Sequence, residues 1–269
     1  MRRMQRKTPE VQASAKLARV PTQGEGLEGQ PPTKRGTHEA AIEQLIEPMR
    51  NGEGQRLCFI GASRKGKTAF AIKLARAMQA EGLAKSIIIV DHKWADKQQY
   101  EGTAVTSLAQ LRQAYIAGSP TIVCRPGCSV EDAASLVKDA ALMKRERCVL
   151  IIDEMMPALR VNEDTGEVQD QIWSGPSPLW ICLQGGGLGA SIIQLVQLPK
   201  QVPTSLLDQA QAFVVFACGG RTRRYALRLE LFERDVALAA KTYQPGELAL
   251  MWTDQDWDGV TYYSPEASG

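Results

Sequence analysis

A glycine-rich loop near residue 60 constrains the fold of this chain more than any other feature. It consists of Gly61, Ala62, Ser63, Arg64, Lys65, Gly66, Lys67 and Thr68. A short apolar run before it, residues 56–60, suits a buried strand, and residues 69–78 after it carry apolar side chains at helical spacing. A loop of this kind surrounds phosphate oxygens with backbone N–H groups and with the positive end of the helix. These eight residues therefore predict an α/β fold with a site for a nucleoside triphosphate.

Two acidic residues at the end of a later strand complete the expected site. Lys67 would reach the β- and γ-phosphates, and the Thr68 hydroxyl would hold Mg²⁺. Residues 149–152 are apolar and lead into Asp153 and Glu154. At the carboxyl end of a parallel strand, Asp153 can hold the Mg²⁺ shell and Glu154 can polarise a water for attack on the γ-phosphate. The pattern predicts ATP and Mg²⁺ as cofactors, with Thr68 and Asp153 binding the metal and Glu154 acting in catalysis.

Gln197 ends another apolar strand, residues 192–197. A glutamine in that position can donate to a γ-phosphate oxygen or orient the attacking water, although an ordinary exposed strand end accounts for it almost as well. Two predicted strands separate the glycine-rich loop from the strand that ends at Asp153. This order is typical of P-loop ATPases with an additional sheet strand and a catalytic glutamate, and not of nucleotide kinases.

The composition is that of a globular protein without membrane spans. Of the 269 residues, 44% are apolar and 23% are charged. The longest apolar runs, such as residues 213–218, are far shorter than the roughly 20 residues that cross a bilayer as a helix. The basic N-terminus lacks the apolar core of a signal peptide, so we expect a cytoplasmic protein. The six cysteines contain no CxxC pair and lie in or beside predicted strands, which favours buried thiols over a zinc site.

The chain divides into an arm and a single domain. Residues 1–36 are rich in Arg, Lys, Gln, Gly, Pro and Thr, lack apolar periodicity, and are expected to form a basic disordered arm. Such an arm contacts nucleic acid or a partner protein, or it is simply solvated. Residues 37–269 are expected to form one P-loop ATPase domain. Its first helix would be capped by Thr37 and would end at about Glu47, before Pro48.

Within this domain, apolar strands alternate with amphipathic helices as far as residue 212. The expected strands are residues 56–60, 86–91, 121–125, 148–153 and 191–196, with helices at 67–80, 107–117 and 130–144. This alternation indicates a mainly parallel sheet sandwiched by helices. The C-terminal β extension, residues 213–269, is expected to add strands without helices between them, at 213–218, 224–231, 247–253 and 260–264. The last two of these strands would form an antiparallel hairpin.

Several further segments resemble the FtsK–HerA superfamily of DNA translocases. Residues 88–93, Ile-Ile-Val-Asp-His-Lys, with Tyr100-Glu101-Gly102 after them, resemble the second-strand signature of that family. Residues 189–209 are similar to its strand that ends in Gln-x-Pro and is followed by a proline and a short helix. Pro245-Gly246-Glu247 and the strand after them are similar to its closing strands. The resemblance spans about residues 55–265.

The resemblance implies a RecA-like P-loop ATPase core in a homo-oligomeric ring, a hexamer or a similar assembly, that hydrolyses ATP to pump DNA through its centre. We do not expect any segment of these 269 residues to form the membrane region or the DNA-reading winged helix of the bacterial division translocases. The chain therefore looks most like the genome-packaging ATPases of tailless, internal-membrane viruses with double-stranded DNA. The partners implied are double-stranded DNA and the capsid or membrane proteins of a packaging vertex. The location implied is the host cytoplasm or the virion itself.

The chain departs from the family pattern at the arginine that acts in trans across the ring. Where cellular members carry an Arg before the strand at 191–196, this chain has Gly185-Gly186-Gly187. Arg221 and Arg223 are the first choices for the missing catalytic cation, because they lie in a Gly-led turn before an expected strand. Arg125, Arg160 and Arg224 are the other candidates.

Other functions stay open at this point. A plasmid, conjugative or chromosomal DNA-pumping ATPase would use the same motor residues. A small-molecule or nucleotide kinase would need an Arg-rich lid and an acceptor pocket, and the sequence indicates neither. A non-catalytic, nucleotide-binding assembly protein would have little chemical reason to keep Lys67, Thr68, Asp153 and Glu154 together.

Overall fold

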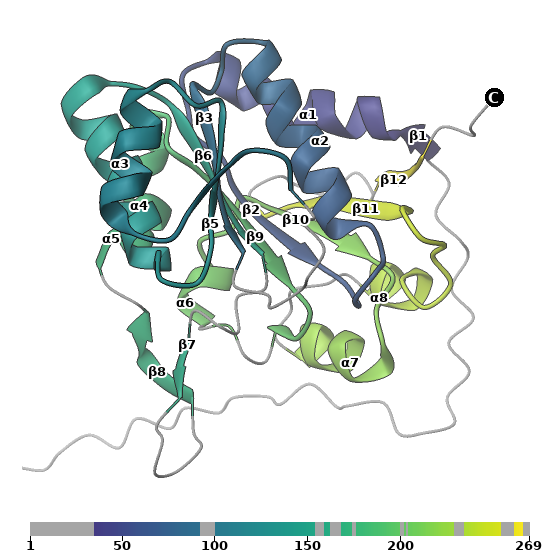
Figure 1. Ribbon diagram of the computed structural model, residues 1–269. Helices are drawn as coiled ribbons and strands as arrows, with labels where there is room; N and C mark the ends of the chain where they lie inside the picture. The colour runs from purple at the N-terminus through teal and green to yellow at the C-terminus, as the bar shows by residue number, and fades with distance from the viewer. Residues whose placement is uncertain are drawn as a thin grey trace, which may run out of the picture.

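One large sheet organises the fold. The computed structural model describes residues 35–91, 100–153, 159–161, 168–173, 176–199, 202, 204–228, 234–253 and 261–265 (Figure 1). Ten strands form the sheet in the order β1-β12-β11-β10-β2-β9-β6-β3-β5-β4. Their bounds are β1 Arg35–Thr37, β2 Arg56–Ile60, β3 Ser86–Asp91, β4 Thr103–Val105, β5 Thr121–Cys124, β6 Cys148–Asp153, β9 Ser191–Val196, β10 Ala212–Phe216, β11 Leu248–Trp252 and β12 Thr261–Ser264.

Nearly all strands of this sheet run in the same direction. From β10 to β4 each neighbouring pair is parallel, whereas β11 is antiparallel to both β10 and β12. β1 is parallel to β12 at the edge. The expected parallel core and the antiparallel pairing of the last two strands are therefore confirmed. The strands expected at 56–60, 86–91, 148–153 and 191–196 have the predicted bounds, and β5 and β10 differ from prediction by one or two residues at their ends.

Helices cover both faces of the sheet, and each face has its own apolar core. On one face, α1 (His38–Arg50) and α2 (Lys67–Ala80) pack over strand residues such as Phe59 and Ile151. Residues of the remaining helices belong to the core of the other face. These helices are α3 Leu108–Ile116, α4 Val130–Asp139, α5 Pro176–Leu183, α6 Thr204–Leu207, α7 Gly220–Arg228 and α8 Arg234–Ala239.

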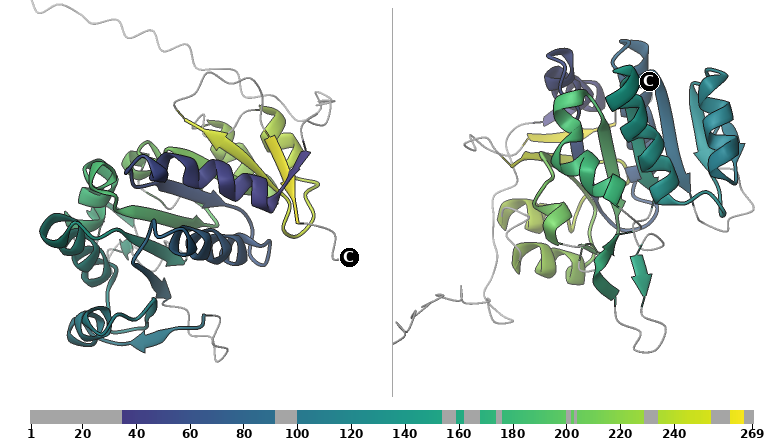
Figure 2. Two further views of the ribbon diagram at one scale, coloured as in Figure 1. Left: turned by 90° about the horizontal axis from the view of Figure 1, so that it is seen from above. Right: turned by 90° about the vertical axis from the view of Figure 1, so that its left-hand side faces the viewer.

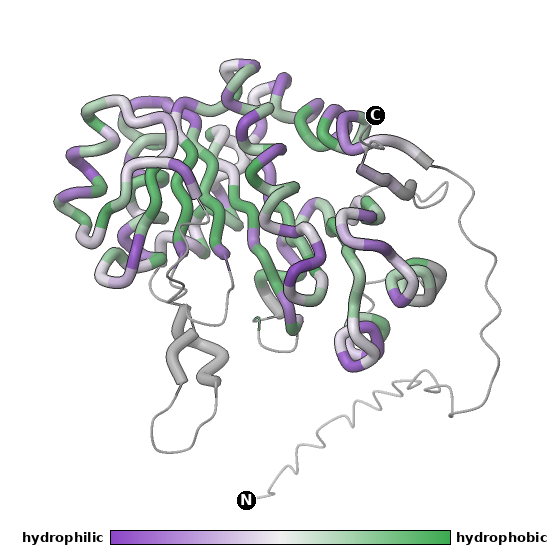
Figure 3. The backbone as a smooth tube through the Cα atoms, turned by 45° about the vertical axis from the view of Figure 1, so that its right-hand side comes forward, coloured by the Kyte–Doolittle hydropathy of each residue, from purple (hydrophilic) through white to green (hydrophobic). Residues whose placement is uncertain are grey.

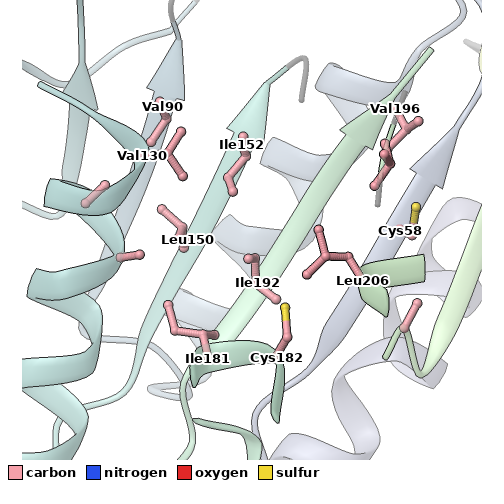
Figure 4. Packing of buried hydrophobic residues seen from close by; sticks show 14 of the residues in the cluster. Cys58, Val90, Val130, Leu150, Ile152, Ile181, Cys182, Ile192, Val196 and Leu206 are labelled. Atoms are coloured by element: carbon pink, nitrogen blue, oxygen red, sulfur yellow. The ribbon is translucent and has the colours of Figure 1, made fainter. Parts of the chain in front are cut away.

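The central strands read as continuous apolar runs because both of their faces are buried. In β2, Leu57 and Phe59 belong to the core on one face, and Cys58 and Ile60 belong to the core on the other. Figure 3 shows this arrangement as hydrophobic strands between helices with hydrophilic stretches. Figure 4 shows residues of β6 and β9 packing against labelled residues of α4, α5 and α6. All six cysteines are buried, as their positions in the sequence predicted.

The first helix runs further than its proline suggested. Thr37 caps α1 as expected, since its hydroxyl accepts from the Ala40 N–H at 3.3 Å. The expected end at Glu47 is wrong, because α1 continues through Pro48 to Arg50. Met49 is 1% exposed, and Arg50 forms ion pairs with Glu43, Glu47 and Glu81. Burial of one residue and pairing of the next therefore offset the backbone hydrogen bond that a proline removes.

The strand expected at 224–231 is also wrong, because residues 220–228 form the helix α7. Apolar and polar residues alternate in this stretch, which is the pattern of a half-buried strand. In the structure the buried positions of α7 are Thr222 and Ala226, four residues apart, whereas Leu227 is 37% exposed. The residues of α7 that pack against the core are therefore small. The strand prediction was wrong because it relied on the large apolar residues of this stretch. α8 likewise contradicts the expectation that no helix follows residue 213.

Other departures lie in the connections. The helix expected at 130–144 begins with a capping box between Ser129 and Asp132, and its last five residues, Ala140–Lys144, form a π-helix. β4 and α5 were not expected, nor was the two-stranded antiparallel sheet of β7 (Leu159–Val161) and β8 (Val168–Trp173). Figures 1 and 2 show β7 and β8 standing apart from the large sheet.

Two residues that were assigned to the N-terminal arm belong to the sheet, because Arg35 and Gly36 are part of β1. The rest of the expected arm, residues 1–34, lies outside the described residues. A Cβ on Gly36 would lie 2.8 Å from the Tyr263 ring, so a glycine lets β1 approach this part of the sheet. No helix in the described part of the chain has both the length and the apolar character needed to cross a membrane.

Candidate active site

The glycine-rich loop leaves the carboxyl end of β2 between two neighbouring strands. The Gly61 N–H donates to the Val196 carbonyl at 3.1 Å, and the Ala62 N–H donates to the Ala217 carbonyl at 2.8 Å. A Cβ on Gly61 would lie 2.7 Å from the Cβ of Phe216, so a larger residue would displace β10. The start of the loop is therefore fixed between the ends of β9 and β10.

The other end of the loop begins α2 in a conformation that favours glycine. Gly66 is the N-cap of α2, with φ at 98°, and it has no side chain to cap the helix. The Gly246 N–H donates to the Lys65 carbonyl at 3.2 Å, and a Cβ on Gly66 would lie 3.1 Å from the Gly246 Cα. The first N–H groups of a fourteen-residue helix thus point toward the loop, which is the arrangement that binds phosphate.

Lys67 places a positive charge inside this loop. It is the first residue of α2 and only 7% exposed, and its Nζ donates to the carbonyls of Gly61 and Ala62, at 2.8 Å in each case. The ammonium group therefore lies among the backbone groups that would surround a phosphate. This is the position that its expected role requires.

Tyr100 brings the two expected metal-binding residues together. Thr68 is the second residue of α2, and Asp153 is the last residue of β6. The Tyr100 hydroxyl donates to Oδ2 of Asp153, and the Thr68 side chain lies beside the same hydroxyl. Tyr100 and Asp153 are 2% and 4% exposed. Burial, with the adjacent Asp153 carboxylate, raises the pKa of Tyr100 far above its usual range, so the phenol keeps its proton.

The oxygen atoms of Thr68 and Asp153 fit a Mg²⁺ ion. Both side chains lie beside the Tyr100 hydroxyl, so their oxygen atoms are close to each other. Mg²⁺ is usually held by one or two protein oxygens and takes its other ligands from water and phosphates. A Thr–Asp pair beside a phosphate-binding loop suits an ion that takes its other ligands from the nucleotide and from water.

A second buried acid, Asp91, lies next to Asp153. β3 and β6 are parallel neighbours, and Asp91 stands in register with Asp153 at their carboxyl ends. Arg125, which follows β5, donates from Nη1 to Oδ2 of Asp91 at 2.6 Å. The side chains of Asp91 and Arg125 are 3% and 20% exposed. Arg125 was one of the candidates for action in trans, and the structure instead pairs it with an acid of its own chain.

Of the expected catalytic residues Gln197 and Glu154, the structure describes only Gln197. Gln197 directly follows β9, which lies between β2 and β6, so it shares a sheet edge with the glycine-rich loop and Asp153. It is half-buried, and its carbonyl accepts from the Thr222 hydroxyl at 3.3 Å. Glu154 lies outside the described residues. Its role rests on its position directly after Asp153 and stays a prediction.

Three of the four other candidate arginines for the catalytic cation lie on α7. Arg221 and Arg224 are exposed, whereas Arg223 is half-buried and donates from Nη1 to the Ala237 carbonyl of α8 at 3.2 Å. Thr222, between Arg221 and Arg223, ties the helix to the end of β9 through Gln197. Arg221 and Arg223 therefore lie in a helix and not in the predicted turn before a strand. Arg160 belongs to β7, and its side chain is not among the described parts of the structure.

The three glycines at 185–187 lie near the amino end of β2, at the opposite end of that strand from the glycine-rich loop. They begin a 3₁₀ helix, Gly185–Leu188, and the Gly54 N–H donates to the Gly186 carbonyl at 2.6 Å. A Cβ on Gly186 would lie 3.4 Å from Nη1 of Arg56, the first residue of β2. The glycine-rich loop follows the other end of β2, about 17 Å away for a five-residue strand. A residue at position 186 could therefore serve this loop only on another copy of the chain.

Sequence reasoning missed several groups around the loop. Tyr100 does not end a strand and Asp91 ends a different one, so neither appeared as a candidate, although both lie in the segments that resemble the translocases. His38, at the start of α1, lies with Nε2 2.7 Å from the Gly246 carbonyl and meets the Phe70 ring edge-on. Gly246 therefore links the N-terminal helix to the glycine-rich loop, and no local pattern could have predicted that contact.

Solved structures with a similar fold are known for viral and bacterial proteins. No protein-family model matches the chain. No curated protein matches its sequence. The genome packaging NTPase B204 from Sulfolobus turreted icosahedral virus 2, in complex with sulfate, aligns with a TM-score of 0.60 and 17% identity, covering 81% of this chain and 99% of that chain.

Two further structures agree with this comparison. B204, the DNA-packaging ATPase from Sulfolobus Turreted Icosahedral Virus, aligns with a TM-score of 0.58 and 18% identity, covering 78% of this chain and 97% of that chain. VirB4 of Thermoanaerobacter pseudethanolicus aligns with a TM-score of 0.55 and 11% identity, covering 79% of this chain and 90% of that chain. The chain therefore has the α/β fold of these P-loop ATPases, as the sequence predicted.

Proposed function

We propose that this protein is an ATPase that couples the hydrolysis of Mg·ATP to the movement of DNA. The observation that carries the proposal is the convergence of three side chains at one sheet edge. Lys67 lies inside the glycine-rich loop, and Thr68 and Asp153 meet at the Tyr100 hydroxyl. A phosphate-binding loop and a metal-binding pair therefore face the same place, which is what the hydrolysis of a nucleoside triphosphate requires.

Each residue has a defined role in this proposal. The backbone N–H groups of residues 61–66 and the Lys67 ammonium bind the β- and γ-phosphates. Thr68 and Asp153 hold Mg²⁺, which when bound offsets the negative charge of the phosphates. Glu154 takes a proton from the attacking water, and Gln197 orients that water or donates to a γ-phosphate oxygen.

The movement of DNA is supported by likeness of fold. The chain spans nearly the whole of the viral packaging ATPase with which it aligns. From this we propose that the protein packages double-stranded DNA into a preformed viral capsid. In this role it would lie in the host cytoplasm or at a packaging vertex and would dock on capsid or membrane proteins there. B204 structures in complex with AMPPCP and with ATP-gammaS support ATP as the nucleotide.

A homo-oligomeric ring, with a hexamer as the first expectation, belongs to the same proposal. Hydrolysis needs a second protein cation, in addition to Lys67, to offset the charge that develops on the γ-phosphate. Arg125 is paired with Asp91 within the chain, so we assign that role to Arg221 of a neighbouring copy, with Arg223 as the second choice. Arg221 is exposed, and its helix, α7, contacts the end of β9. The Arg221 side chain could therefore reach a neighbouring copy of the chain.

The turnover of ATP with and without DNA tests this function. We expect the rate of phosphate release to rise when linear double-stranded DNA is added, and to rise less with single-stranded DNA. A rate of ATP turnover that does not change with DNA but depends on a small phosphate acceptor would establish a kinase instead. Nucleotide binding without any turnover would establish the non-catalytic assembly protein. A plasmid, conjugative or chromosomal DNA pump would pass the same test and would differ in its partners.

A further inference from the structure

Tyr100 links a residue of α2 to a residue of β6. Its hydroxyl donates to Oδ2 of Asp153 and lies beside the Thr68 side chain. Thr68 and Asp153 come from parts of the chain that are 85 residues apart, and Tyr100 comes from a third part, between β3 and β4. One phenol therefore lies against both residues to which metal binding is assigned, and it is hydrogen-bonded to one of them.

The number of protons sets the direction of the hydrogen bond to Asp153. The phenol has one proton, and a carboxylate oxygen accepts, so the proton of Tyr100 points to Oδ2 of Asp153. This bond fixes the orientation of the Asp153 carboxylate beside Thr68, so that its other oxygen can face a metal ion.

The surroundings of Tyr100 keep its hydroxyl in one place. The ring is 2% exposed and belongs to the same apolar core as Phe70, Ile89 and Ile151. Two residues later, a Cβ on Gly102 would lie 2.8 Å from the Thr121 carbonyl oxygen, so the backbone here lies tightly against the start of β5. A buried ring beside a closely packed backbone cannot swing aside without opening the core.

We propose that Tyr100 is a positioning residue for the Mg²⁺ ion that binds with the nucleotide. Its hydrogen bond to Asp153 orients that carboxylate beside Thr68 before the ion arrives. This inference rests on the proposed function, because it assumes that Thr68 and Asp153 bind the metal. Its consequence concerns the affinity for Mg²⁺, and not the affinity of the glycine-rich loop for phosphate.

The substitution Tyr100→Phe tests the inference, since it removes the hydroxyl and keeps the buried ring. The probe is a fluorescent, non-hydrolysable ATP analogue, whose dissociation constant is measured in EDTA and over a series of free Mg²⁺ concentrations. We expect the Mg²⁺ concentration that gives half-maximal tightening to rise by about 10- to 100-fold. The dissociation constant in EDTA should stay unchanged, which also shows that the variant is folded.

The substitution Tyr115→Phe is the matched control. Tyr115 is also 2% exposed, and its hydroxyl donates to Glu146, which precedes β6 and so lies at the opposite edge of the sheet. Tyr115→Phe should leave the Mg²⁺ requirement unchanged. If Tyr100→Phe leaves it unchanged as well, Tyr100 does not position the ion. If the variant binds Mg²⁺ more tightly, the hydroxyl competes with the ion and the proposal is also overturned.

The result for the unsubstituted protein separates this inference from the proposed function. An unsubstituted chain that does not bind the analogue, or that binds it without any tightening by Mg²⁺, contradicts the proposed ATPase. An unsubstituted chain whose binding is tightened by Mg²⁺ satisfies that proposal, and the comparison with Tyr100→Phe then judges Tyr100 alone.

Discussion

At the scale of the residue, the charge inside the glycine-rich loop governs binding and turnover together. Lys67→Ala removes the ammonium that lies among the loop carbonyls, so the β- and γ-phosphates lose their cation within the chain. We expect phosphate release to be abolished and the circular dichroism spectrum to be unchanged. Lys73→Ala is the control, because Lys73 lies on the same helix and pairs at the surface with Glu39. Turnover near the normal rate in Lys67→Ala would refute the assignment of the loop.

Glu154 is the residue with which chemistry can be separated from binding. Glu154→Gln keeps Thr68 and Asp153 for the metal but removes the base that activates the water. We expect Mg·ATP to bind normally and to be hydrolysed at least about a hundredfold more slowly. The two quantities are measured by binding of labelled ATP and by single-turnover hydrolysis, with the exposed Glu47→Gln as the control. Weaker binding with an unchanged rate per bound ATP would assign Glu154 to structure instead.

At the scale of the element, α7 decides which arginines can reach a neighbouring molecule. Thr222 and Ala226 face the core, so Arg221 and Arg224 are exposed, and Arg223 is held by the Ala237 carbonyl. We expect Arg221→Ala to leave ATP binding intact and to lower the turnover rate by a factor on the order of a thousand. The control is Arg112→Ala, since Arg112 is an exposed arginine of α3. Normal turnover in Arg221→Ala, Arg223→Ala and Arg224→Ala together would exclude α7 as the source of the cation.

At the scale of the whole molecule, the same arginine tests the ring. If Arg221 acts on a neighbouring copy, subunits with Arg221→Ala and subunits with Lys67→Ala are each inactive alone. Mixed rings would contain interfaces that join an intact loop to an intact arginine. We therefore expect partial recovery of ATP turnover on mixing, measured after the subunits have exchanged. No recovery, or an active protein that is monomeric, would contradict action in trans.

The N-terminus provides a prediction on stability. Removal of residues 1–34 keeps every described contact and should leave the melting temperature unchanged, while weakening recruitment to DNA in a salt-dependent manner. Removal of residues 1–37 takes away β1, which pairs with β12, and the Thr37 cap of α1. That truncation should lower the melting temperature measured by calorimetry. A large loss of stability on removing residues 1–34 would show that the arm folds onto the domain or onto a neighbouring copy.

Much of this molecule could be predicted from the sequence because the determining signals are local. A strand that is buried on both faces must be apolar throughout, so the central strands were found almost to the residue. The glycine-rich loop is recognised from eight consecutive residues, and Gly66 has a φ of 98°, a local backbone conformation that favours glycine. Asp153 ends its strand, and the parallel order of the sheet brings it to the edge from which the loop leaves.

The remaining features depend on contacts between distant parts of the chain. α1 continues past Pro48 because Met49 is buried and Arg50 is paired, and α7 is a helix because small residues, which carry little apolar signal, face the core. The link from Thr68 through Tyr100 to Asp153 joins three segments that only the packed sheet brings together. Periodicity in a sequence records which residues are buried, whereas the partner of a buried polar group is decided by the tertiary structure.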